Sequence, residues 1–190
     1  SDVSRVYNAE LNAAGTAVLT SGTLFSDDSL SGGTFAFTTK DAGDGNKTVN
    51  VSAVTVNDGN SGNNYAVTYA ANTTSTITQL DLSVTGSTAA NRVYDGTTVE
   101  ALGGTAAVSQ ISGDTVTVGG TAVGSFENEN VGTGKAVTVT GVTIGGTDAG
   151  NYNLVQQTGL TANITAASIT ISTSDVSRVY NAELNAAGTA

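Results

Sequence analysis

The sequence predicts an all-β protein made of tandem, immunoglobulin-like (Ig-like), antiparallel β-sandwich repeats. Three observations lead to this prediction: the chain repeats itself, its apolar and polar residues alternate over short segments, and glycine-containing turns separate those segments. Hydrophobic residues make up 38% of the chain and charged residues only 12%, a composition too apolar for a disordered protein. Leu, Glu and Lys are scarce, which argues against a helical bundle.

The two ends of the chain carry the same segment. Residues 1–17, SDVSRVYNAELNAAGTA, return letter for letter as residues 174–190, which gives a long period of 174 − 1 = 173 residues. We therefore divide the chain into a first repeat at 1–80, a second repeat at 81–173 and the start of a third at 174–190. Because the chain opens without an initiator Met or a signal peptide, we expect it to be an excerpt of a longer protein.

A weaker repeat lies inside this long period. An Arg-Val-Tyr motif ends at Tyr7, Tyr94 and Tyr180, which are 94 − 7 = 87 and 180 − 94 = 86 residues apart. A β-helix repeats after roughly 20–30 residues, whereas an immunoglobulin-type sandwich needs on the order of 100. We therefore expect separate sandwich units in a row rather than the stacked rungs of one solenoid.

Alternating segments supply the predicted strands of each unit. They lie at 34–37 and 48–51 in the first repeat and at 114–118 and 136–139 in the second. In both repeats the alternation slips by one residue shortly afterwards, at 52–53 and at 140–141. We expect a bulge or bend at each slip, because it keeps the valines on both sides of the slip facing the core.

Turn-forming residue pairs fill the gaps between these segments, and their glycines supply the positive φ of tight connections. These pairs lie at 44–45, 58–59, 95–96, 119–120 and 145–146. Only residues 9–14 and 99–102 have a helix-like composition, and both segments are too short to form a stable helix alone.

The composition excludes most catalytic chemistry. The chain has no His, Cys, Met, Trp or Pro, which removes thiolate and imidazole metal sites, disulfides and histidine-assisted nucleophiles. Carboxylates are the remaining acid or base groups, and a glycosidase needs two of them with aromatic platforms, but aromatic residues make up only 5% of the chain. The candidates are Asp27, Asp28, Glu100, Glu127 and Glu129. We assign no catalytic residue and expect no enzyme.

The net charge of −10 limits the partners of the chain. Nucleic acids and anionic membranes attract basic surfaces, so neither is an expected partner. No run of about 18 apolar residues occurs, and we expect no membrane insertion.

Calcium is the one metal ion that the sequence leaves open, because it binds oxygen ligands. Residues 41–46 resemble a calcium loop faintly, but their counterpart at 130–134 lacks the acidic residues, and a hairpin turn is the preferred interpretation. Asp81 or Asp175 between repeats is a second candidate. We assign no metal ligand and no cofactor, and a glycan- or calcium-binding module remains the alternative function.

The repeated Arg-Val-Tyr motif is the sharpest local feature. Its residues are either ligand contacts or structural anchors, in which each Tyr fixes the first strand of its unit and each Arg pairs with a nearby carboxylate. We favour the anchor interpretation, because a residue that recurs once per folding unit is what folding alone requires. The anchor residues are Arg5, Tyr7, Arg92, Tyr94, Arg178 and Tyr180.

Three segments of the second repeat, at 92–98, 131–139 and 148–152, resemble the YDG-type repeat of filamentous-haemagglutinin-like bacterial surface adhesins, many of which are exported by two-partner secretion. The first repeat resembles the same family, with Asn8-Ala9 in place of Asp-Gly, where we expect a longer turn. The resemblance implies an extracellular, Cys-poor, Ig-like β unit used in tandem as a stalk on the bacterial cell surface, without enzyme activity.

We expect a structural and adhesive protein whose partners are neighbouring repeats of the same protein, including a homopolymer. A host or neighbouring-cell surface is bound by parts outside this chain. Residues 174–190 cannot fold alone, and we expect their strand pattern to seek a sheet edge. They either pair back onto the second repeat or begin the next unit in a head-to-tail fibre, with an excerpt boundary as the plain alternative.

Overall fold

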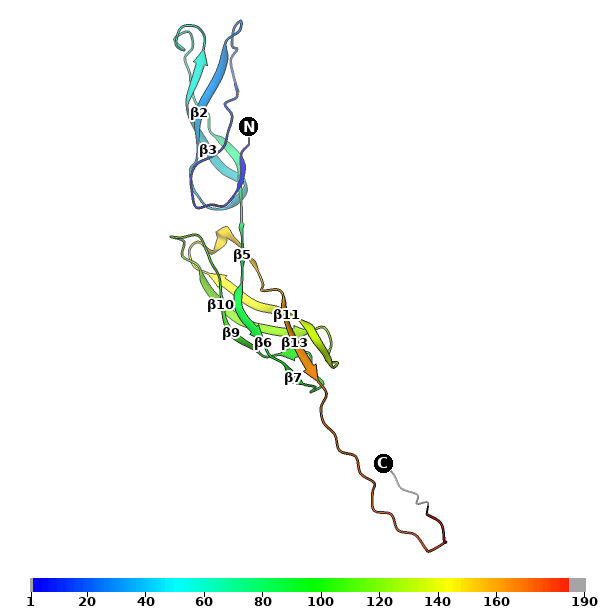
Figure 1. Ribbon diagram of the computed structural model, residues 1–190. Coiled ribbons are helices and arrows are strands. Elements are labelled where there is room, and N and C mark those ends of the chain that lie inside the picture. Colours follow the sequence, from blue (N-terminus) through cyan, green and yellow to red (C-terminus); the bar gives the residue numbers. More distant parts are fainter. Residues whose placement is uncertain (1, 185–190) are drawn as a thin grey trace.

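The computed structural model describes residues 2–184 and confirms the all-β class. Two β units follow one another end to end, and an extended C-terminal segment leaves the far end of the second unit (Figure 1). Within the described range, the single helical element is a 3-10 turn, η1 (Ala149–Asn151). No helix in that range is long and apolar enough to cross a membrane.

The first repeat contains a four-stranded sheet with the strand order β1-β4-β3-β2. Its strands are β1 (Ser4–Val6), β2 (Ser29–Phe37), β3 (Gly43–Asn57) and β4 (Asn72–Thr78). β1 runs parallel to β4, with Ser4 opposite Thr76, and the other neighbours are antiparallel. The strand that carries the Arg-Val-Tyr motif therefore lies at a sheet edge.

The second repeat contains a sheet of the same plan, with the order β7-β13-β11-β10-β8. Its strands are β7 (Arg92–Val93), β8 (Val99–Glu100), β10 (Thr117–Phe126), β11 (Gly132–Gly145) and β13 (Leu160–Thr165). β7 runs parallel to β13, as β1 does to β4.

Two further strand pairs complete the second repeat. β5 (Leu80–Ser83) runs parallel to β12 (Tyr152–Val155), and β6 (Thr85–Ala89) runs antiparallel to β9 (Leu102–Ala107). Because β5 and β6 are almost continuous, residues 80–89 form one strand between two partners. Among the described residues, the first repeat has no strand in this place.

The long strands bend where the alternation slips, as predicted. Ala53 and Gly141 both have positive φ, 53° and 85°, inside β3 and β11. A Cβ on Gly141 would clash with the Thr121 carbonyl oxygen, so the second repeat needs glycine there. The valines on both sides of each bend face inward, and Val137, Val139 and Val142 are buried.

Most predicted turn glycines have positive φ, but the pairs at 44–45 and 119–120 were wrongly placed in connections, because they lie inside β3 and β10. Gly120 has a φ of 74° and lies inside β10, where the register with β11 shifts. Positive φ serves a bulge as well as it serves a turn, and sequence alone does not separate the two. The segments with helix-like composition form no helix: residues 99–100 belong to β8, residue 102 begins β9, and Asn12 forms an isolated bridge with Ala36.

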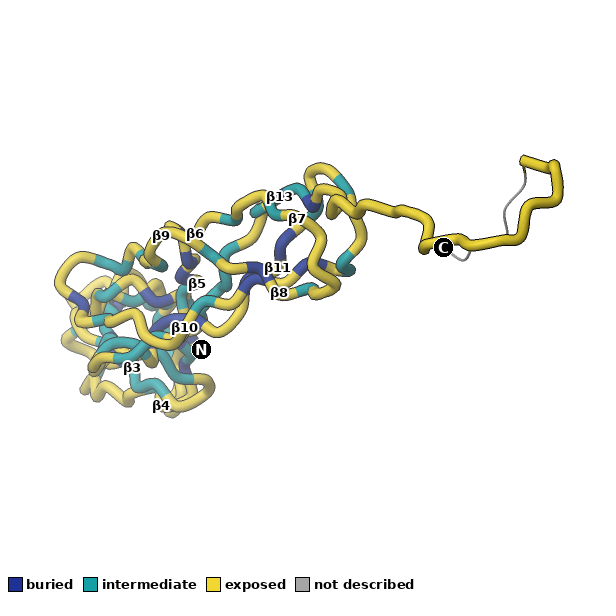
Figure 2. Tube along the Cα trace, turned by 90° about the horizontal axis from the view of Figure 1, so that it is seen from below, coloured by how far each residue is buried: buried dark blue, intermediate teal, exposed yellow. Residues whose placement is uncertain are grey.

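The largest core cluster crosses from one repeat into the other. Five buried residues come from the first repeat and two from the second: Val3, Tyr7, Phe37, Val49 and Ile77, with Leu82 and Tyr152. A second cluster, built around Phe126 and Ile164, lies within the second repeat. Figure 2 shows the buried segments within the two units and an exposed C-terminal segment beyond them. The repeats are therefore joined by shared core rather than by a linker alone.

Candidate functional site at the repeat junction

The connection between the repeats is a single residue. β4 ends at Thr78 and β5 begins at Leu80, so only Gln79 separates them. The Gln79 side-chain amide donates a hydrogen bond to the Gly150 carbonyl of the second repeat, at 3.0 Å. A connection of one residue, itself tied to the second repeat, leaves little freedom for the two units to swing.

Asp114 is the centre of the junction. Its Oδ2 accepts hydrogen bonds from the hydroxyls of Tyr7, at 2.7 Å, and Tyr152, at 2.6 Å. Its Oδ1 accepts one from Lys40 Nζ at 2.8 Å. The Asp114 side chain is only 1% exposed, so these partners replace water. Tyr7 and Lys40 belong to the first repeat and Asp114 to the second, so this carboxylate bonds the repeats together.

Packing reinforces the hydrogen bonds. The rings of Tyr7 and Tyr152 meet edge to face, with centroids 5.5 Å apart and planes at 74°. The Tyr152 hydroxyl, which donates to Asp114, also accepts from the backbone N–H of Ile111 at 2.9 Å. Nearby, the Ala42 N–H donates to the buried Asn151 side chain at 2.8 Å.

The charges at the junction are mutually stabilising. Burial raises the pKa of Asp114, but hydrogen bonds from Lys40, Tyr152 and Tyr7 outweigh burial and leave that pKa below its ordinary value. The hydrogen bond to Asp114 raises the pKa of Lys40 most, and the interaction with Tyr7 raises it further. Burial, followed by the Asp114 hydrogen bond, raises the pKa of Tyr152 to about 12 and also raises that of Tyr7. At neutral pH the junction thus holds a carboxylate, an ammonium and two neutral phenols.

Lys40 has a second carboxylate partner. Its Nζ lies 3.3 Å from Asp148 Oδ1, and that residue also accepts a hydrogen bond from the Thr115 N–H at 2.9 Å. The Asp148 side chain is 17% exposed and that of Asp114 only 1%, so water screens the contact of Lys40 with Asp148 more strongly than its contact with Asp114.

The three predicted tyrosine anchors lie in three different environments. Tyr7 is 2% exposed in the junction, Tyr94 is 42% exposed at the far end of the second repeat, and Tyr180 is 89% exposed in the C-terminal segment. Only Tyr7 is followed by a complete repeat among the described residues. The tyrosine of the motif is therefore buried where a complete next unit follows it and exposed at the two positions where none is described.

Each predicted arginine anchor binds the loop that follows its own tyrosine. Arg5 donates to the carbonyls of Glu10 and Asn12, and Arg92 donates to those of Thr97 and Val99. Arg178 repeats the arrangement by donating to the Glu183 carbonyl.

The aromatic and acidic neighbours of the arginines differ between repeats. Arg5 lies 4.8 Å over the Phe37 ring, and Arg92 lies 5.2 Å over that of Phe126. Arg92 forms the predicted carboxylate pair, at 3.1 Å from Asp95. The hydrogen bonds of Arg5 go to carbonyl and amide oxygens instead.

The carboxylates considered for catalysis or calcium assemble no metal site among the described residues. Within the described range, no group of three or more acidic side chains is placed to hold a metal ion. Glu100 is buried and accepts from the Ala90 N–H at 3.0 Å, and Asp44 accepts from the Thr76 hydroxyl at 3.1 Å. Asp81 accepts from Asn153 at 2.7 Å, and Asp175 is exposed.

Sequence reasoning missed the contacts of Asp114, Lys40 and Tyr152, although one signal was present. The first repeat contains the acid–tyrosine part of this arrangement, because the Tyr65 hydroxyl donates to Asp28 at 2.6 Å and accepts from the Phe25 N–H at 2.9 Å. An internal alignment that matched these two acid–tyrosine pairs would have marked them as repeated structure.

A turn follows the tyrosine in both repeats, and its geometry accounts for the two residues that come next in the sequence. Asp95 Oδ1 accepts from the Thr97 N–H at 2.9 Å, and Gly96 has a φ of 73°. In the first repeat Asn8 accepts from the Glu10 N–H at 3.1 Å, and Ala9 takes a φ of 63°. The predicted longer turn at Asn8 is therefore wrong, because asparagine caps the same turn and alanine accepts its left-handed conformation.

A family model described as the YDG domain matches residues 1–75 and 78–159. The chain belongs to the YDG domain family. No curated protein and no solved structure matches it. In this YDG protein, the tyrosine of the signature supplies the junction contact at Tyr7, and its second and third residues form the turn that the arginine holds.

Replacing Asp114 with Asn should loosen the junction. The amide keeps one acceptor oxygen, but its NH2 group faces donors and it no longer pairs with Lys40. We expect Asp114→Asn to lower the free energy of unfolding by about 2 kcal/mol in urea titrations followed by circular dichroism. Asp28→Asn is the matched control, with no lysine partner and a loss below about 1 kcal/mol. Equal losses for the two variants would contradict the assigned role.

The junction should also weaken in acid. The pKa of folded Asp114 lies below 3.8, so its contribution to stability is complete above that value and is lost as the pH falls through the folded pKa. Other carboxylates titrate here too, so the measurement is the difference between wild type and Asp114→Asn at each pH. We expect this difference to shrink below about pH 4. A difference that stays constant to pH 2 would contradict it.

Proposed function

We propose that this chain is a structural stalk segment of a large extracellular bacterial adhesin or fibre of the filamentous-haemagglutinin-like class. Its Ig-like β-sandwich repeats act as spacers between the cell surface and a binding region elsewhere in the parent protein. The observation that carries the proposal is the junction, where a one-residue connection, a shared core and a buried Asp114 join the repeats. A stalk needs this kind of junction, because it has to hold its two ends at a fixed distance and orientation.

The composition supports the same proposal. A chain without cysteine folds outside the cell without redox assistance, and a net charge of −10 keeps a long array soluble and self-repelling in the unfolded state. The polar groups at the junction already bond to one another within the chain: the carboxylate of Asp114 accepts hydrogen bonds from three protein groups. The proposal therefore assigns neither a catalytic role nor a cofactor to the chain, and names neighbouring repeats as its direct partners.

Electron microscopy of the purified chain tests the stalk proposal. We expect elongated two-unit particles of constant length and a narrow distribution of bend angles between the units. The same particles should be seen in EDTA and in millimolar calcium, because the junction uses lysine rather than a metal ion to neutralise Asp114. Compact particles, or units hinged at random angles, would falsify the proposal. Straightening that requires calcium would favour the calcium-binding alternative.

A further inference from the structure

The first repeat has an unfilled strand position. In the second repeat, residues 80–89 lie between β12 and β9, and Leu82 and Val84 are buried there. The corresponding segments of the first repeat are 65–68 and 15–20, and neither is part of a described strand.

Three contacts establish which residues correspond. The bridge of Asn12 to Ala36 matches the pairing of Val99 with Ser125. The pair Tyr65–Asp28 matches Tyr152–Asp114. The Val54 N–H donates to the Tyr69 hydroxyl as the Val142 N–H donates to Gln156. Since 152 − 65 = 87 and 156 − 69 = 87, residues 65–69 correspond to 152–156.

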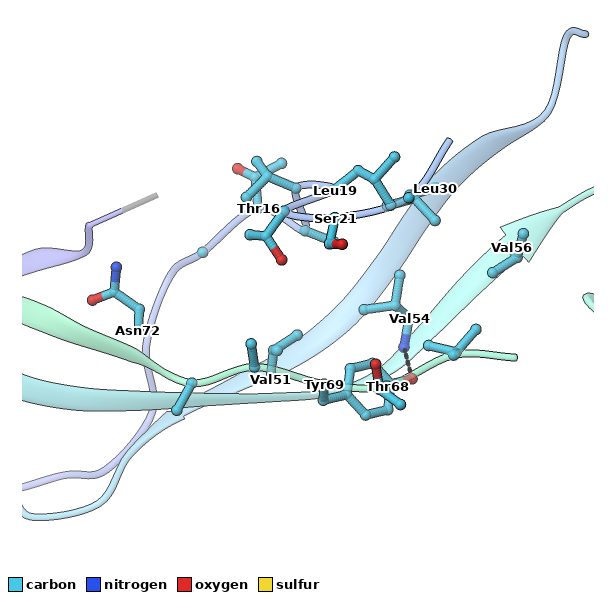
Figure 3. Close-up of a pocket in the computed structure, with 18 of the residues that line it drawn as sticks. Thr16, Leu19, Ser21, Leu30, Val51, Val54, Val56, Thr68, Tyr69 and Asn72 are labelled. Atoms are coloured by element: carbon cyan, nitrogen blue, oxygen red, sulfur yellow. Dashed lines mark hydrogen bonds between the residues drawn. The ribbon is translucent and has the colours of Figure 1, made fainter. Parts of the chain in front are cut away.

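An apolar groove of about 560 Å³ occupies this position in the first repeat. Figure 3 shows Leu19, Leu30, Val51, Val54 and Tyr69 among the side chains that line it. Val51 and Val54 are half-buried here, whereas their counterparts in the second repeat, Val139 and Val142, are buried. The groove is thus the place that residues 80–85 fill in the second repeat.

The chain contains a segment that matches the missing strand. Ile77 and Ile164 occupy equivalent positions in β4 and β13, 87 residues apart, and each is 1% exposed. With the same offset of 87 residues, Ile169 corresponds to Leu82 and Ile171 corresponds to Val84. Ile169 is 80% exposed and Ile171 75% exposed, and Ser168, Thr170 and Ser172 alternate with them. This segment has the alternation of a half-buried strand but no core to cover in its own chain.

The segment reaches the groove only in another copy. It leaves the second repeat at the end opposite the first repeat (Figure 1). The residues that follow it, 174–190, are identical to those that begin the first repeat. In a copy that precedes another, the segment therefore stands directly before SDVSRVY, just as residues 80–89 stand before Arg92-Val93-Tyr94.

We propose that residues 167–172 of one copy of this chain form the missing strand in the first repeat of the next copy. The β5–β12 register then places Ala167 opposite Tyr65 and Ile169 opposite Val67, parallel to 65–68. Ile169 and Ile171 fill the groove, and Ser168 and Thr170 face solvent. This inference deepens the proposed stalk function and rests on it.

The contact is head-to-tail, so it does not close into a dimer and propagates as a fibre. It also brings the half-exposed Tyr94 to the end of the next copy that carries Asp28 and Tyr65, as Tyr7 meets Asp114 and Tyr152 within one copy. The position of Lys40 is taken by Glu129, since 126 − 37 = 89 and 129 − 40 = 89 for residues aligned on Phe37 and Phe126. The strand therefore has to supply more of the attraction at this second junction than at the first.

Charge variants of the exposed segment give the first test. Ile169→Asp with Ile171→Asp places two charges on the face that enters the groove. The matched control, Ser168→Asp with Thr170→Asp, adds the same charge on the outward face, where β5 itself carries Asp81. In sedimentation equilibrium of the full chain, we expect the isoleucine variant to weaken self-association at least tenfold and the control to change it less than threefold. Equal effects would overturn the proposal.

A disulfide test makes the outcome independent of affinity. Two copies are joined through the shared segment, as residues 1–173 followed by 1–190, with Ser168→Cys in the first copy and Ala66→Cys in the second. Because the native chain has no cysteine, these are the only thiols. We expect nearly complete disulfide formation within the joined chain. The control moves the first cysteine to Ser172, about 13 Å further along the strand and beyond disulfide reach.

No disulfide at 66 and 168, or equal disulfide formation in the control, would overturn the strand proposal. If the single chain is a straight rod in electron micrographs while the disulfide fails to form, the strand inference is wrong and the stalk proposal stands. If the disulfide forms but the chain is compact or randomly hinged, strand donation stands and the stalk proposal fails.

Discussion

The buried carboxylate of Asp114 is the interaction on which the arrangement of the two repeats depends. A charged group removed from water is tolerated only when protein donors replace the water, and two of its three donors, Tyr7 and Lys40, come from the other repeat. Separating the repeats would therefore expose the carboxylate to water and break the edge-to-face contact between Tyr7 and Tyr152. Since Gln79 alone links the strands, chain connectivity and electrostatics hold the same geometry.

The residues of the repeated motif have different structural roles. Tyr7 contacts the next repeat. The arginine two residues before the tyrosine instead donates hydrogen bonds to backbone carbonyls of the loop that follows in its own repeat. The aspartate or asparagine caps the turn between them. The same turn forms at Asn181, in the exposed C-terminal segment, so it needs no neighbouring repeat. The turn is therefore local structure, and burial of the tyrosine is the part that requires a partner.

Strand alternation made most strands and both bends predictable, because a period of two allows the valines beside Ala53 and Gly141 only one inward-facing solution. The purely antiparallel pairing was wrong, because β1–β4 and β7–β13 are parallel, and only residues 117–118 of the predicted strand at 114–118 lie in β10. The contacts of Asp114 with Tyr7 and Lys40 were not predictable, since Asp114 lies 107 residues from Tyr7 and 74 from Lys40 and one sequence does not say which polar groups meet. A period also gives the length of a repeat but not its starting point. Residues 167–172, grouped with the second repeat by periodicity, lie outside its sheets, and residues 80–89 show which role such a segment plays.

The central claim is that the junction is rigid, and a distance distribution across it tests this most directly. Spin labels at Asn50→Cys in β3 and Thr143→Cys in β11 are both on exposed positions of paired strands, and no other thiol is present. Pulsed electron paramagnetic resonance should give one narrow distance in the otherwise wild-type chain and a broader distribution when Asp114→Asn is added. A broad distribution in the chain that retains Asp114 would contradict the account.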